Sequence, residues 1–157
     1  MCAIEENKLS ELFQRYGGDV FRLAFGWLGN RPDAEDVCQS VFLKLADGRK
    51  WPDPGKEKAW LLTCAANACK NHLRSFWRRN VGELEENIPF EEPRDRALYA
   101  AVMALPPKYR AVIHLYYYEG YDQRETGEIL HISRTAVQTR MSRARAMLKK
   151  ELSEDDT

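Results

Sequence analysis

The stretch DQRETGEILHISRTAVQTRMSRARAMLKK, residues 122–150, decides how the C-terminal part of the chain folds. Asp122 followed by Glu125 forms a capping box, so we expect a helix that begins there and ends near residue 130. Ser133 is a good N-cap for a longer helix over about residues 134–152. The apolar residues of that helix recur at steps of four, three and four, and they are Val137, Met141, Ala144 and Leu148.

Two helices joined by residues 131–133 have the proportions of a helix-turn-helix, which places the start of its second helix in the DNA major groove. If the apolar stripe faces inward, Arg134, Thr135 and Gln138 point outward, with Arg145 further along. Arginine can pair with guanine and glutamine with adenine, so this face is a candidate base-reading surface. Arg140 and Arg143 lie to the sides, where we expect contacts with phosphates. An ordinary basic terminal helix is the alternative.

Charge is segregated along the chain although the total is zero, with 24 Lys and Arg against 24 Asp and Glu. Residues 56–79 hold six basic residues against one acid, and residues 131–150 hold six basic residues and no acid. Between these blocks, residues 80–98 hold six acids against two arginines. Because a neutral protein is not drawn to nucleic acid as a whole, any DNA affinity must come from the two basic blocks.

The chain is predicted to be all-helical, with two small helical domains joined by a flexible acidic linker. Every periodic segment has the helical period, and none alternates as a strand does. Residues 81–95 contain Pro89 and Pro93 and lack helical periodicity, so we place the linker there. The two domains are then residues 1–80 and 96–157.

In the first domain we expect three antiparallel helices. Gly17 and Gly18 are candidate points for a kink in the first helix. The second helix begins at residues 31–33 and has a polar outer face that includes Glu35, Asp36, Gln39 and Ser40. The third, residues 58–77, is expected to bury a stripe made of Leu61, Ala65, Ala68, His72 and Phe76.

Basic and aromatic residues interleave on the third helix and on the loop before it. Aromatic rings beside a cationic track suit single-stranded bases, which stack on the rings. The residues that favour this interpretation include Trp51, Lys56, Lys70, Arg74 and Arg78. Trp60 and Phe76 are better interpreted as members of the core.

The sequence does not favour an enzyme. It has no glycine-rich phosphate loop, nucleophile elbow or H-E-x-x-H motif, so we predict no catalytic residues, no metal and no cofactor. The cysteines form no C-x-x-C pair and are expected to be reduced thiols, although a metal or thiol sensor built on Cys38, Cys69 and His72 is an alternative. No segment predicts a membrane span or a signal peptide, so we expect a cytoplasmic protein without membrane insertion.

Two parts of the chain resemble conserved regions of bacterial RNA polymerase sigma factors. Residues 33–42, with residues 59–63 and 67–74, resemble the second conserved region. Residues 105–110 and 132–145 resemble the fourth. A chain with these two regions and a short linker is similar to the extracytoplasmic-function group, which is the smallest class of sigma factor.

This resemblance implies roles for the surfaces. The outer face of the second helix (Glu35, Asp36, Gln39 and Ser40) would hold the clamp helices of the largest polymerase subunit. The loop at residues 48–58 and the third helix would bind the melted non-template strand of the −10 element. The −10 residues would be Trp51, Lys56, Asn67, Lys70, Asn71, Arg74 and Arg78.

The resemblance also implies partners. The helix-turn-helix would read the −35 duplex through Arg134, Thr135, Gln138, Arg140, Arg143 and Arg145, and it would meet the polymerase flap. The acidic linker would run into the polymerase cleft and the RNA exit path. An anti-sigma factor is an expected partner, because family members are commonly held inactive by one.

Three sites depart from the family pattern. Thr126-Gly127 stands where a larger apolar residue and an alanine are usual, His131 replaces the usual turn glycine, and Asn71 replaces a common aspartate. A left-handed turn at His131 would be mildly strained. The rival function is a stand-alone helix-turn-helix regulator that binds duplex DNA alone, with a first domain that dimerises or senses a signal.

Overall fold

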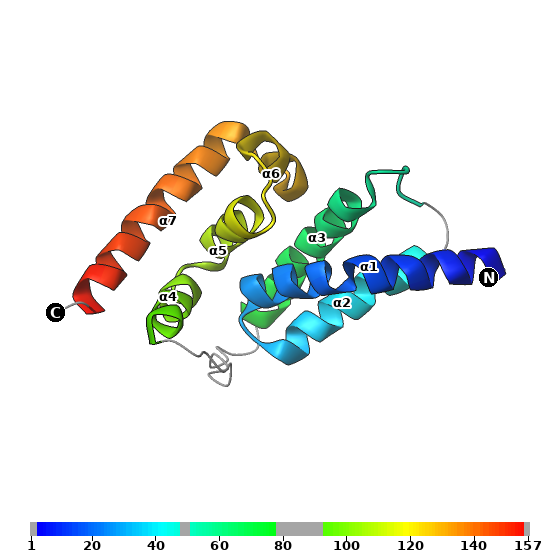
Figure 1. Cartoon of the computed structure of the whole chain (residues 1–157), viewed down its shortest axis with the longest axis horizontal. Helices are drawn as coiled ribbons and strands as arrows, with labels where there is room; N and C mark the ends of the chain where they lie inside the picture. The colour runs from blue at the N-terminus through cyan, green and yellow to red at the C-terminus, as the bar shows by residue number, and fades with distance from the viewer. Residues whose placement is uncertain (1–2, 48–50, 78–92, 156–157) are drawn as a thin grey trace. The chain divides into compact units, whose positions relative to one another are not determined.

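The computed structural model describes residues 3–47, 51–77 and 93–155, and every regular element in these ranges is helical (Figure 1). The all-helical prediction is therefore confirmed. The chain divides into two compact units, Met1–Glu83 and Leu84–Thr157. The predicted linker lies outside the described residues up to position 92.

Three helices form the N-terminal unit: α1 (Ala3–Leu28), α2 (Arg31–Ala46) and α3 (Glu57–Trp77). Each helix packs against the other two (Figure 1). Burying one large aliphatic side chain contributes about 1.5–3 kcal/mol, so such residues are the main stabilising contribution to the packing of the three helices. Fully buried members of this core are Val20, Leu23, Leu45, Leu61 and Leu62.

The start of α2 is fixed by Asn30, whose side-chain oxygen accepts a hydrogen bond from the backbone N–H of Asp33 at 2.9 Å. Pro32 stands in the first turn, where a missing N–H leaves no hydrogen bond unmade. Asp33 in turn contacts His72 of α3, with Oδ1 and Nε2 3.0 Å apart. The predicted start signal is confirmed, and a polar contact joins the two helices there.

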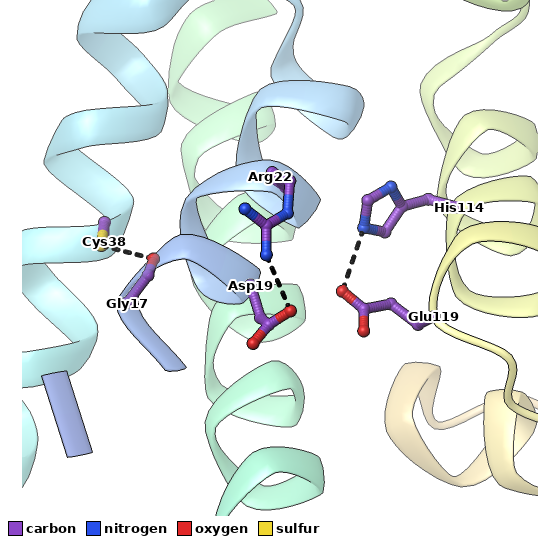
Figure 2. Close-up of polar contacts among 6 residues, drawn as sticks. All are labelled: Gly17, Asp19, Arg22, Cys38, His114 and Glu119. Atoms are coloured by element: carbon purple, nitrogen blue, oxygen red, sulfur yellow. Dashed lines mark hydrogen bonds and ion pairs between the residues drawn. The ribbon is translucent and has the colours of Figure 1, made fainter. Parts of the chain in front are cut away.

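α1 continues without interruption through Gly17 and Gly18. Gly17 is buried, and its carbonyl oxygen accepts a hydrogen bond from the Cys38 thiol at 3.7 Å (Figure 2). A β-carbon on Gly17 would lie 3.5 Å from the ring of Phe13, which is ordinary van der Waals contact.

The C-terminal unit contains α4 (Pro93–Met103), α5 (Pro107–Ile113), η1 (His114–Tyr118), α6 (Gln123–Leu130) and α7 (Arg134–Asp155). The helices α4, α5 and α6 all pack against α7. α4 begins at Pro93, inside the range that the sequence assigned to the linker, because proline is tolerated in the first turn of a helix.

Arg110 ties the end of α4 to the start of α5. Its guanidinium is buried, and Nη1 donates to the carbonyl oxygens of Met103 at 3.1 Å and Leu105 at 2.8 Å. Carbonyl groups at the end of a helix lack hydrogen-bond donors within the helix, and here the Arg110 guanidinium is the donor. Burial lowers the pKa of Arg110 from its usual value.

Residues 107–118 form α5 followed directly by a π-helical turn, η1. The wider turn brings residues five apart together: His114 Nε2 and Glu119 Oε1 lie 3.6 Å apart (Figure 2). The extra residue also shifts the register, so that Leu115 is fully buried while Tyr116 is half-buried. Gly120 follows this turn with a φ of 80°, a backbone conformation that favours glycine.

The turn between α6 and α7 depends on a close approach at Gly127. Its carbonyl oxygen accepts a hydrogen bond from the Ile132 N–H at 2.9 Å, and His131 is left-handed with a φ of 57°. A β-carbon on Gly127 would lie 2.7 Å from the carbonyl oxygen of Ile132. Gly127 therefore lowers the helix propensity of α6, but the absence of a β-carbon permits this turn.

The start signals of the helix-turn-helix are confirmed. The side chain of Asp122 accepts a hydrogen bond from the Glu125 N–H at 2.7 Å, and the Glu125 side chain accepts one from the Asp122 N–H at 3.2 Å. The Glu125 N–H lowers the pKa of the Asp122 carboxyl. Ser133 Oγ caps α7 by accepting from the Ala136 N–H at 3.0 Å.

The predicted inner stripes hold better for α7 than for α3. In α7, Val137, Met141 and Ala144 are fully buried, and Leu148 is half-buried. In α3, Ala68 and His72 are only half-buried, and Cys69 takes the buried position instead. Because α3 packs against two helices, its buried surface is broader than one stripe. The side chain of Phe76 lies outside the described residues.

Two glycine-to-alanine substitutions are expected to change the free energy of unfolding in opposite directions. Gly127→Ala should lower the free energy of unfolding of the C-terminal unit by roughly 1–3 kcal/mol, because its β-carbon meets a backbone oxygen. Gly17→Ala should raise that of the N-terminal unit by about 1 kcal/mol, through helix propensity. Urea unfolding followed by circular dichroism measures both. A more stable Gly127→Ala protein would contradict the close approach.

Candidate functional site

The outer face of α2 carries the four predicted polymerase-binding residues, and all four are exposed. The opposite face of the helix is buried through Val37, Val41 and Leu45, which fixes the direction of the polar side chains. The exposed set is Glu35, Asp36, Gln39 and Ser40.

An apolar groove of about 880 Å³ lies between α1 and α2, beside this face. Its wall includes Phe13 and Leu43, which are 53% and 64% exposed. Asp36 and Gln39 also line the groove, so polar and apolar groups face the same space. Large apolar side chains exposed together beside polar groups mark a surface that binds another molecule.

A second, polar groove of about 450 Å³ lies between α2 and α3. It brings together residues that the sequence assigned to two different surfaces: Asp36 and Ser40 from α2, and Asn67 and Asn71 from α3. Lys44 lines the same groove and was missed from the sequence. The predicted polymerase-binding and −10 residues are therefore neighbours.

The remaining −10 candidates differ in how exposed their side chains are. Lys56 is exposed, while Lys70 is half-buried. Trp51 is half-buried, with Nζ of Lys8 from α1 lying 4.9 Å from the centre of its ring. Lys8 lies far from Trp51 in the sequence, so no local pattern pointed to it. The side chain of Arg74 and the whole of Arg78 lie outside the described residues.

The outer face of α7 carries the predicted −35 residues. Arg134, Thr135, Gln138, Arg143 and Arg145 are exposed, and Arg140 is half-buried.

Two of these residues are held by side chains from other elements. Gln138 Nε2 donates to Oε1 of Gln123 at 2.9 Å, and Arg145 Nε donates to the hydroxyl of Tyr117 at 2.7 Å. The Arg145 guanidinium also lies 5.7 Å from the centre of the Tyr117 ring. Neither Gln123 nor Tyr117 was identified from the sequence.

Two of the cysteines have little access to solvent. Cys38 and Cys69 are buried, and burial raises the pKa of both thiols, to about 12 for Cys69. A thiol with a raised pKa is a poor nucleophile and a poor metal ligand at neutral pH. Within the described ranges, no three His, Cys, Asp or Glu side chains gather closely enough to hold a metal ion.

None of the helices in the described ranges combines the length and apolar character that a membrane span requires.

Comparison with protein families assigns both units. The model of sigma-70 region 2 matches residues 12–79, and the model of sigma-70 region 4 matches residues 95–148. The sigma factor SigL of Mycobacterium tuberculosis is 30% identical over 170 residues, an alignment that covers 98% of this chain and 93% of the relative. The chain belongs to the sigma-70 family. Its relatives place this sigma factor in the extracytoplasmic-function group.

Other relatives agree with this placement. SigM of Bacillus subtilis is 27% identical over 151 residues, covering 90% of this sigma factor and 93% of the relative. SigE of Mycolicibacterium smegmatis is 30% identical over 152 residues that cover 88% of the chain, although the chain spans only 59% of that relative.

Solved structures show the same fold. The sigma factor RpoE of Bartonella quintana, in complex with the anti-sigma factor NepR, has a TM-score of 0.73 and 18% identity, covering 93% of this chain and 97% of that one. CnrH, in complex with the cytosolic domain of CnrY, has a TM-score of 0.68 and 24% identity, covering 96% and 90%.

The family match decides between the interpretations of the sequence. Sigma factors bind core RNA polymerase and direct it to promoters, and they are not enzymes in the catalytic sense. The match of residues 12–79 to region 2 does not fit a first domain built for dimerisation or sensing. The two regions together support a sigma factor rather than a stand-alone regulator.

The buried thiols make a chemical prediction. With its pKa near 12, Cys69 should be thiolate at pH 8 about a thousandfold less often than a thiol of pKa 9. Iodoacetamide should therefore leave Cys69 unmodified in the folded protein, and mass spectrometry should find it alkylated after unfolding in urea. Rapid alkylation of folded protein at Cys69 would revive the thiol-sensor alternative.

Proposed function

We propose that α2 is the main polymerase-binding element of this sigma factor. The observation that carries the proposal is the exposed set Glu35, Asp36, Gln39 and Ser40 beside an apolar groove that contains exposed Phe13 and Leu43. A partner helix could place apolar side chains in the groove and basic ones against the carboxylates. Such a surface gives both affinity and orientation.

Promoter melting is assigned to the surface formed by α3 and the preceding loop. Asn67, Asn71 and Lys56 are exposed, and Trp51 with Lys8 offers an aromatic ring beside a cation. No bond is made or broken in this step. The protein opens DNA because it binds unstacked bases better than paired ones, which shifts the equilibrium between two DNA states.

Reading of the −35 duplex is assigned to α7. Its exposed arginines supply charge along one face, and Arg134 and Gln138 stand one turn apart near its start. Bidentate contacts to base edges contribute about 1–3 kcal/mol of discrimination each. Arg140 and Arg143 are assigned to phosphates, which position the helix.

The proposal also covers the domain limits, the cellular location and a regulatory partner. The N-terminal unit acts as region 2, and the C-terminal unit, from the start of α4 at Pro93, acts as region 4, with the acidic linker between them. Because the protein works on core polymerase, its place is the cytoplasm. RpoE is solved in complex with the anti-sigma factor NepR, and CnrH in complex with the cytosolic domain of CnrY. We therefore infer that an anti-sigma factor is a partner and that it covers the α1–α2 groove.

A double substitution on α2 tests the polymerase assignment. Asp36→Ala with Gln39→Ala is expected to weaken association with core polymerase at least tenfold, because it removes a charge and an amide from the centre of the exposed face. Biolayer interferometry with immobilised core enzyme measures the dissociation constant.

The matched control removes one carboxylate and one amide from α1. Glu11 and Gln14 are exposed and line neither groove, so Glu11→Ala with Gln14→Ala should leave the dissociation constant unchanged. Equal affinities for the two double variants would remove α2 from the binding surface.

Arg143 tests the phosphate assignment. Arg143→Ala is expected to weaken binding of the holoenzyme to all −35 sequences alike and to reduce the slope of log affinity against log salt by about 0.9. Lys149→Ala removes the same charge nearer the end of α7 and should have little effect. A sequence-dependent loss for Arg143→Ala would make Arg143 a base reader instead.

A further inference from the structure

The reading face of α7 is joined to α6 by one hydrogen bond between amide side chains. Nε2 of Gln138 donates to Oε1 of Gln123 at 2.9 Å. The two residues are far apart in the sequence, and Gln123 is the first residue of α6. Gln138 is exposed, so this bond is made on the surface that faces solvent in the free protein.

An exposed glutamine is a poor reader of bases when nothing holds it. Its terminal torsion is broad, so the amide plane has no strong preferred orientation. A glutamine identifies adenine only when its N–H points to N7 and its oxygen to the N6 amino group at the same time. A side chain ordered before binding loses less entropy when it binds.

The contact with Gln123 leaves the required groups available. A glutamine amide carries two N–H donors and an oxygen with two acceptor sites. Gln138 uses one donor on Gln123, so one N–H and the oxygen remain for a base. This is the pair of groups that matches the major-groove edge of adenine.

Gln123 lies in a well-ordered turn of the protein. It follows Asp122, whose side chain takes part in the capping box with Glu125 and so fixes the first turn of α6. It is half-buried, and it lines a small cavity of about 310 Å³ with Tyr116 and Arg134. Side chains that support a binding residue act best from rigid elements of this kind.

We propose that Gln123 is a positioning residue that orients Gln138 for an adenine in the −35 duplex. The proposal rests on the assignment of α7 as the −35 reader. Gln123 itself reads no base: it sets how strongly one A·T pair is preferred, and it acts through Gln138. Two helices of the motif then share the recognition of a single base pair.

The test compares holoenzymes assembled from core polymerase and five forms of the sigma factor, the wild type and four variants. Gln123→Ala removes the acceptor. Gln123→Glu keeps an oxygen acceptor for Gln138 but replaces the amide donor with a carboxylate. Gln138→Ala removes the reader, and the double variant Gln123→Ala with Gln138→Ala measures their coupling.

The probe is a library of promoter duplexes randomised over the −35 segment, sequenced after binding. Wild type is expected to enrich an A·T pair at one position, and Gln138→Ala should abolish that enrichment alone. Gln123→Ala should reduce it about threefold, which is part of the discrimination that one bidentate contact supplies, and leave other positions unchanged. Gln123→Glu should keep the enrichment, while its added charge lowers affinity for all sequences.

The double variant should select the same sequences as Gln138→Ala, because Gln123 acts only through its partner. An unchanged A·T preference in Gln123→Ala overturns the proposal, as does a uniform loss at all positions. If Gln138→Ala leaves the selection unchanged, Gln138 reads no base and the proposal also falls. If wild-type holoenzyme selects no sequence at all, the −35 assignment fails together with it.

Discussion

The constraint on which the structure depends is that each unit is small, so a helix can bury one face and must leave the other to solvent. In α2 the buried side chains Val37, Val41 and Leu45 leave Asp36 and Gln39 outside. In α7 the burial of Val137, Met141 and Ala144 leaves a row of basic side chains on the opposite face. The hydrophobic core thus determines which polar residues a partner can reach.

The turn between α6 and α7 adds a second constraint, on direction. Gly127 lets the carbonyl group of Ile132 approach α6 closely, and His131 accepts a left-handed conformation to complete the turn. The angle of α7 is therefore set by backbone contacts. Gln123 and Tyr117 then hold Gln138 and Arg145 from outside the helix. On the proposed assignment of α7 to the −35 duplex, this arrangement orders the reading side chains before they meet DNA, which favours specificity.

The sequence predicts contacts between residues that are close in the chain and misses contacts between residues that are distant in it. The capping box at Asp122, the Ser133 cap and the inner stripe of α7 depend on residues within a few positions of one another, and all three are confirmed. The π-helical turn was missed because one extra residue in a helix leaves no mark in the hydrophobic period. His72 was assigned to the core, but its contact is Asp33, near the start of a different helix. Gln123, Tyr117 and Lys8 were missed for the same reason: each meets its partner only after folding.

The two basic surfaces belong to separate units, and the total charge of the chain is zero. On the proposed assignments, promoter recognition requires core polymerase to hold both units at the spacing of a promoter. Run-off transcription on a bacterial promoter library, with purified core enzyme and with or without this protein, tests that claim most directly. The account predicts defined transcripts only when both are present, and weak promoter binding by the protein alone. Tight binding by the isolated protein, with no transcript from the mixture, would contradict it.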